Sequence, residues 1–259
     1  MLMILSPAKT FTSEENVPRT NFKALLFHEK TAKLVEQLSS FSNEQLGSLM
    51  KMSEELATLN SARYRQFYSD ELQALPSIYA FSGEAYKGLD ALTLDQGALE
   101  FSNESLRILS GLYGVLHPFD AINPYRLEMG LKFSGEHGKN LYEYWRRELT
   151  DYFLSALATT PGDQVLINLA STEYSKVVDF KQIKQQYGVL TIEFKEQKGE
   201  SFRTVGMYAK RARGQMARYI LTRKLHSVEE LKQFNEEGYQ FNEDLSTPAT
   251  WVFTRSVKG

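Results

Sequence analysis

The sequence predicts a mixed α/β or α+β fold in a single compact domain that spans residues 1–259. Short runs rich in Val, Ile, Leu and Phe are typical of buried strands, and longer segments between them repeat apolar residues at helical spacing. The two kinds of segment do not alternate strictly, which argues against a plain doubly wound sheet. No internal repeat or low-complexity linker marks a second domain, and a chain of this length buries a full core.

Six short apolar segments are expected to form strands. The first opens the chain and lacks the basic lead-in of a signal peptide. Gln197-Lys198-Gly199-Glu200 joins two of the segments and is typical of a hairpin turn. The expected strands are Leu2–Leu5, Ile78–Phe81, Gln164–Leu169, Val189–Phe194, Phe202–Gly206 and Thr250–Thr254.

Helices are expected beside these strands. Ser42 and Gln45 form a capping-box pattern, which predicts a helix through Met52. A second pattern of this kind runs from Ser227 to Glu230. Further segments carry an apolar stripe at helical spacing, namely 53–67, 140–157 and 207–225.

Composition excludes several kinds of chemistry. The absence of cysteine rules out disulfides, thiolate metal ligands and thiol peroxidase chemistry. The four histidines are far apart in sequence and show no metal-ligand spacing, so no metal or other cofactor is expected. No segment approaches membrane-spanning length, and we infer a cytoplasmic protein without a membrane partner.

One window of the chain is strongly basic although the net charge is −2. Residues 201–228 contain no Asp or Glu, and a local patch of this kind attracts polyanions. The alternative is a solvated helix face whose acidic partners lie elsewhere in the fold. Gly214 within the helical pattern lowers local helix stability or allows another backbone to approach closely. The basic residues are Arg203, Lys210, Arg211, Arg213, Arg218, Arg223 and Lys224.

Two closely spaced glycines suggest a phosphate-binding turn. A helix that begins near Asn103 is expected to end at Gly111, and Gly114 follows three residues later. The backbone amides of a tight turn here would bind a phosphate oxygen, as in a helix–hairpin–helix motif. The alternative is an ordinary helix C-cap followed by a turn.

Polar residues in three separate segments are candidates for a common cleft. Lys9 closely follows the first expected strand, where ligand-binding groups are common. Arg126 and Glu128 would share one face of an extended segment, and Ser171 is a candidate N-cap with Glu173 in the first helical turn. Together these segments supply the residue types that a binding site needs.

Several motifs along the whole chain resemble those of the YaaA family of bacterial peroxide stress proteins. The resemblance implies resistance to hydrogen peroxide through limited free iron and less oxidative DNA damage. It also implies DNA binding, a family-specific fold, a positively charged cleft and a helix–hairpin–helix element. The motifs are SPAKT at 6–10, LSGLYGVL at 109–116, PYRLEMG at 124–130, INLAS-x-EY at 167–174, YAK-x-ARG at 208–214 and FNEEGYQFNED at 234–244.

The resemblance assigns the hairpin to the two glycines and the cleft to basic residues of the family motifs. His117 is one departure, because the family pattern has Arg there, and a neutral imidazole next to the hairpin weakens phosphate binding. The expected DNA-binding residues are Lys9, Gly111, Leu112, Tyr113, Gly114, Arg126, Lys210, Arg211, Arg213 and Arg218.

Three functions follow as hypotheses. The first is a protective protein that binds duplex or distorted DNA largely without reading sequence. The second is a lyase or glycosylase acting on damaged DNA or nucleotides, with Lys9 or Lys210 as nucleophile beside Glu128 or Glu173. The third is an iron-sequestering protein that uses carboxylates and histidines. The sequence contains no established catalytic motif and points to no obligate protein partner.

Overall fold

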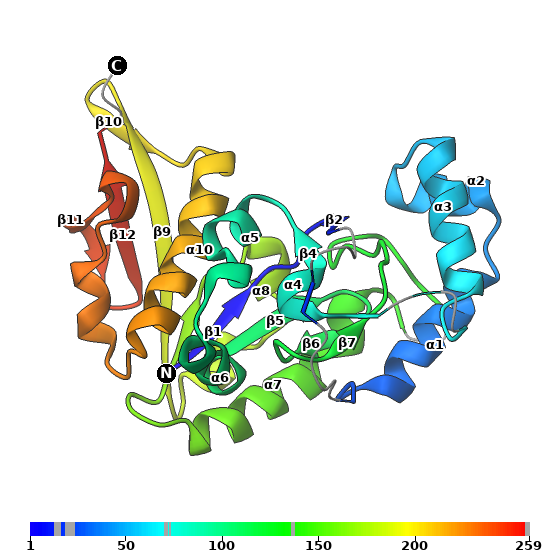
Figure 1. Ribbon diagram of the computed structural model, residues 1–259, viewed down its shortest axis with the longest axis horizontal. Coiled ribbons are helices and arrows are strands. Elements are labelled where there is room, and N and C mark those ends of the chain that lie inside the picture. The colour runs from blue at the N-terminus through cyan, green and yellow to red at the C-terminus, as the bar shows by residue number, and fades with distance from the viewer. Residues whose placement is uncertain (13–16, 19–23, 70–71, 73, 136–137, 257–259) are drawn as a thin grey trace.

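A mixed sheet runs through the protein, and its central strands are parallel (Figure 1). The computed structural model describes residues 1–12, 17–18, 24–69, 72, 74–135 and 138–256. The parallel strands lie in the order β12 (Thr250–Arg255), β9 (Gly188–Lys198), β8 (Val165–Asn168), β1 (Leu2–Leu5) and β5 (Leu106–Ser110).

Antiparallel strands complete the edges of this sheet. β11 (Gln240–Thr247) pairs with β12, β6 (Gly114–Leu116) pairs with β5, and β10 (Ser201–Arg203) pairs with β9. Two smaller sheets pair β2 (Thr10–Phe11) with β4 (Phe81–Ser82), and β3 (Leu75–Pro76) with β7 (Ala121–Ile122). The fold is therefore mixed α/β, as the sequence predicts.

Helices cover both faces of the sheet at its centre. Every residue of β1 and β5 is buried, and successive strand residues point to opposite faces. The helices are α1 (His28–Ser39), α2 (Asn43–Met50), α3 (Glu54–Arg65), α4 (Ser77–Ala80), α5 (Glu84–Leu89), α6 (Gln96–Ser105), α7 (Leu141–Thr159), α8 (Thr172–Ser175), α9 (Phe180–Ile183) and α10 (Gly206–Arg223). Short 3-10 helices are η2 (Ala91–Thr93), η3 (Val228–Gln233) and η4 (Glu236–Gly238).

Helix α10 packs on α5 through two glycines. A Cβ atom at Gly214 would lie 1.7 Å from the carbonyl oxygen of Ala85. A Cβ atom at Gly88 would lie 2.1 Å from the carbonyl oxygen of Arg211. Of the two roles considered for Gly214, the close backbone approach is thus confirmed, and it holds the basic helix against the start of α5.

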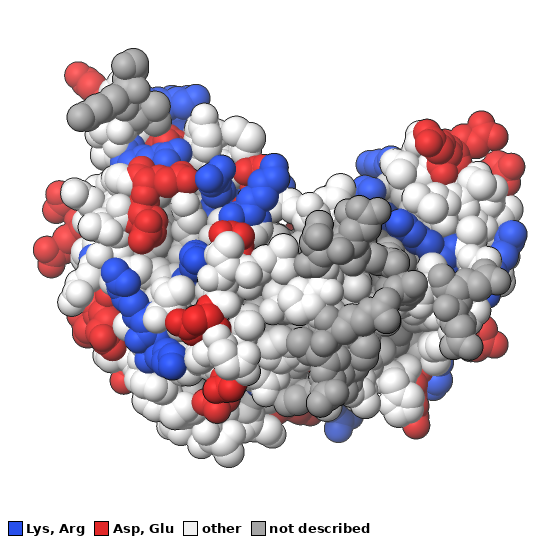
Figure 2. Space-filling model, in the orientation of Figure 1, with Lys and Arg blue, Asp and Glu red and all other residues white. Residues whose placement is uncertain are grey.

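Helices α1, α2 and α3 form an arm at one end of the molecule, away from β11 and β12 (Figure 1). The predicted capping box is present, because the Ser42 hydroxyl accepts from the Gln45 amide while the Gln45 side chain accepts from the Ser42 amide. Figure 2 shows that the surface is hollowed between the arm and the part that carries α5 and α10, with Lys and Arg on both sides of the hollow.

Most expected elements are confirmed with small shifts of their ends. Five of the six expected strands are present as β1, β8, β9, β10 and β12, and the expected turn joins β9 to β10. The expected helices correspond to α2, α3, α7 and α10. The long amphipathic helices are predicted most accurately, because their apolar stripes repeat over several turns.

Three expectations about elements are wrong. Residues Ser77–Ala80 form the buried helix α4 in place of a strand, since a short apolar run alone does not distinguish the two. Ser227 makes no capping bond; its hydroxyl donates to Asp163, and a 3-10 helix follows. The segment after Asn103 leaves the helix at Ser105 and continues as the buried strand β5.

Candidate ligand-binding cavity at the strand ends

A cavity of about 590 Å³ opens where β1 and β8 end. The segment after β1 supplies Ser6 and Lys9, and the segment after β8 supplies Ser171 and Glu173. Ligands commonly bind beyond the carboxyl ends of parallel strands. The further lining residues are Leu5, Pro7, Ala8, Thr10, Ser82, Gly83, Glu84, Ala85, Tyr86, Glu128, Leu169, Thr172, Tyr174, Lys210 and Arg213.

Ser6 and Ser171 tie the two strand ends together. The Ser171 amide donates to the Ser6 hydroxyl oxygen at 2.8 Å, and the two hydroxyl oxygens are 3.3 Å apart. Ser171 is the N-cap of α8 as expected, although its own side chain makes no capping bond. Ser6 is not among the residues predicted from the sequence. Lys9 is predicted because ligand-binding groups commonly follow a strand end, and the same argument applies to Ser6.

Glu128 is the buried charge of the cavity. Its Oε1 atom accepts from Lys9 Nζ at 2.9 Å and from Arg126 Nη2 at 2.9 Å, while Oε2 is buried without a hydrogen-bond partner among the described residues. Burial raises the pKa of Glu128, but Lys9 and Arg126 lower it further, so its pKa lies below the ordinary value. Arg126 and Glu128 are expected to share one face of their segment, and the structure brings the two side chains together as an ion pair.

The opposite wall comes from α10. Lys210 is exposed at the cavity, and Arg213 is half-buried with an Nε atom that has no hydrogen-bond partner among the described residues. Burial lowers the pKa of Arg213, against attraction from Glu193. Neither cation forms an ion pair with a carboxylate in the described part of the chain. Both bring positive charge to the lining of the cavity.

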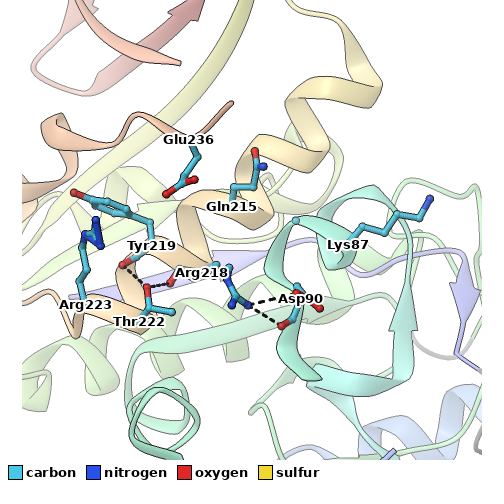
Figure 3. A pocket seen from close by; sticks show the side chains of 9 residues that line it. Lys87, Asp90, Gln215, Arg218, Tyr219, Thr222, Arg223 and Glu236 are labelled. Atoms are coloured by element: carbon cyan, nitrogen blue, oxygen red, sulfur yellow. Dashed lines mark hydrogen bonds and ion pairs between the residues drawn. The ribbon is translucent and has the colours of Figure 1, made fainter. Parts of the chain in front are cut away.

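Two other cations of α10 are engaged elsewhere. Arg211 Nε lies 2.9 Å from Glu237 Oε1, in the segment before β11. Arg218 donates to the carbonyl oxygens of Leu89 and Asp90 and lines a separate pocket of about 250 Å³ (Figure 3). The basic window of the sequence is thus divided among the cavity, the second pocket and the C-terminal segment, and part of its charge is neutralised.

The turn at Gly111 and Gly114 differs from the expected phosphate-binding turn, and this is the main correction to the predicted site. Residues 111–113 connect β5 to β6, which begins at Gly114, as a hairpin between strands, and no helix flanks them directly. Leu112 and Tyr113 are buried, so the turn presents no open row of amides to a phosphate. Gly114 has φ of +74°, and a Cβ there would collide with the Trp145 ring. The two glycines therefore serve a core turn.

His117 follows this hairpin and contacts Tyr152. Its Nε2 atom lies 3.0 Å from the Tyr152 hydroxyl, and its amide donates to Asp120. The imidazole is therefore part of an internal polar contact in this fold, beside the buried hairpin.

Two wider features concern metals and membranes. Over the described ranges, no group of three or more His, Asp or Glu side chains is arranged to hold a metal ion. In the same part of the chain, no helix combines the length and the apolar character needed to cross a bilayer.

The fold and the cavity define a mixed α/β protein with a ligand-sized site at the carboxyl ends of its parallel strands. The chain belongs to the family described as peroxide stress protein YaaA, whose model matches residues 1–245. It is 44% identical over 258 residues to a UPF0246 protein of Idiomarina loihiensis, covering 99% of each chain. It is 45% identical over 261 residues to a UPF0246 protein of Magnetococcus marinus, covering 99% of this chain and all of the relative.

Proposed function

We propose that this protein acts in the response to peroxide stress by binding DNA across the hollow between α10 and the arm. Family membership supports the link to peroxide stress. The observation that carries the DNA-binding part is the presence of cations on both the cavity and a second groove, which the segment 128–130 joins.

Glu128 lines the cavity at one end of this segment, and Gly130 lines a groove of about 850 Å³ at the other. Lys51 and Lys132 lie on the groove, as Lys9, Lys210 and Arg213 lie on the cavity. Cations at both places favour binding of a phosphate backbone, which releases counterions. Glu44, Glu84 and Glu173 also line the cavity or the groove, so binding of moderate strength is expected.

The arm offers a second kind of contact. α2 and α3 are joined by Lys51, Met52 and Ser53, and Lys51 has the left-handed conformation that a tight turn requires. We propose that this helix pair, in place of the glycine turn, takes the role expected of a helix–hairpin–helix element. Its turn carries a cation, which favours phosphate, although Glu54 and Glu55 in the first turn of α3 oppose it.

A salt-titrated binding assay on duplex, bubble and single-stranded DNA tests the proposal. Lys210→Glu and Lys51→Glu place one charge reversal on each wall, and each is expected to weaken binding at least tenfold at low salt. Lys184→Glu is the matched control, because this exposed lysine precedes β9 at the amino ends of the parallel strands. If the two wall variants bind DNA as tightly as the control, the proposed surface is wrong.

A further inference from the structure

The cavity lies where the winding of the sheet reverses. β1 has β5 on one side and β8 on the other, and the chain continues from β8 to β9, farther from β1. The connections that leave β1 and β8 therefore run in opposite directions across the sheet. In open sheets with parallel strands, this switch point leaves a crevice beyond the carboxyl ends, which commonly holds a ligand with a phosphate group.

The walls of the cavity combine apolar surface with separated polar groups. Leu5, Pro7, Ala8, Ala85 and Leu169 supply apolar groups to the lining. A volume of about 590 Å³ lies within the range of sites for small molecules, which are mostly apolar with few polar groups that fix orientation. An apolar ring system that carries polar groups is suited to such a lining.

Unsatisfied polar atoms occur on two sides of this space. The Glu128 side chain is 10% exposed, and its Oε2 atom has no partner among the described residues. On α10, the Nε atom of Arg213 likewise has none in that part of the chain, and Lys210 stands beside it in the lining. Buried polar atoms of native proteins are nearly always paired, so an acceptor and a cationic donor without partners on the lining of one cavity are candidate ligand contacts.

We infer that the cavity binds one nucleotide, with its phosphate on Lys210 and Arg213 and an N–H edge of its base toward Glu128. This orientation is consistent with the chemistry of Glu128. Its carboxylate already pairs with two cations, and a carboxylate accepts hydrogen bonds but donates none, so it would face an N–H group of the base. Lys9 Nζ pairs with this carboxylate at 2.9 Å, so we assign Lys9 a binding role and not that of a nucleophile. The nucleotide is either free or a unit extruded from DNA; the second source rests on the proposed function.

Isothermal titration calorimetry with the four 2′-deoxynucleoside 5′-monophosphates and inorganic phosphate tests the free source. At least one mononucleotide is expected to bind at least tenfold more tightly than phosphate. Arg213→Gln and Thr172→Trp, which fills the cavity from an exposed lining position, should each weaken this binding at least tenfold. Lys184→Gln should leave it unchanged.

Duplex DNA with 2-aminopurine at a mismatch tests the extruded source. A rise in fluorescence on binding, lost in Thr172→Trp while duplex binding persists, indicates a base in the cavity. The inference is overturned if no mononucleotide binds and the fluorescence stays unchanged in bound DNA, or if neither variant alters either signal. If DNA does not bind at all, the proposed function fails, and the mononucleotide titration alone decides the inference.

Discussion

Gly214 in α10 faces the carbonyl oxygen of Ala85 in α5 with no room for a side chain: a Cβ would lie 1.7 Å from that oxygen. The oxygen belongs to backbone, so no rotation of a side chain relieves the contact. This contact sets how closely α10 packs against α5. Helix α10 also carries Lys210 and Arg213, which line the cavity. The packing glycine and the binding cations are therefore parts of one arrangement.

Gly214→Ala should destabilise the protein. Overpacking costs about 1–3 kcal/mol in typical cores, and a clash with backbone belongs at the upper end of that range. Urea unfolding followed by circular dichroism measures the change in the free energy of unfolding. Gly206→Ala is the control, because this glycine begins α10 with no atom within 4 Å of an added Cβ. Equal stability of the two variants would contradict the close contact.

Glu128→Gln should change how stability depends on pH. The folded-state pKa of Glu128 lies below 4.5, so its ionised form stabilises the fold above that pH, and the contribution is lost as the pH falls through the folded-state pKa. The difference in unfolding free energy between wild type and Glu128→Gln should therefore be largest near neutrality and shrink below pH 4.5. Glu230→Gln, at an exposed position, is the control. A difference that is constant with pH would contradict the prediction.

Arg255→Gln should lower the free energy of unfolding more than Arg211→Gln does. Arg255 Nε lies 2.9 Å from Glu196 Oε2, and the Glu196 side chain is 2% exposed. Breaking a buried pair leaves an uncompensated charge and costs about 3–5 kcal/mol. The Arg211 pair with Glu237 is more open to solvent, and its loss costs about 0–1 kcal/mol. Thermal unfolding compares the two variants, and the reverse order would show that Glu196 is solvated.

Lys210→Gln should reduce the salt dependence of DNA binding. A lysine that contacts one phosphate contributes about one unit to the slope of log K against log salt. Filter binding at several salt concentrations measures this slope for the variant and for Lys184→Gln. A slope equal to that of the control would remove Lys210 from the phosphate contacts.

The sequence by itself determined the mixed α/β class and most of the long elements. The amphipathic helices α7 and α10 and the buried strands β1 and β8 follow from local apolar spacing, which the chain carries without reference to its neighbours. It also placed Lys9, Arg126, Glu128 and Ser171 as candidates for one site, and their convergence around Glu128 and the strand ends agrees with that expectation.

Only the tertiary structure decided how the charges are used. Arg211 and Arg213 are two residues apart, yet one pairs with Glu237 and the other lines the cavity. The glycine pair at 111 and 114 suits a phosphate-binding turn in sequence, but Trp145 and the paired strands enclose it. The physical reason is that burial and charge pairing depend on contacts between segments distant in sequence, which local spacing does not encode.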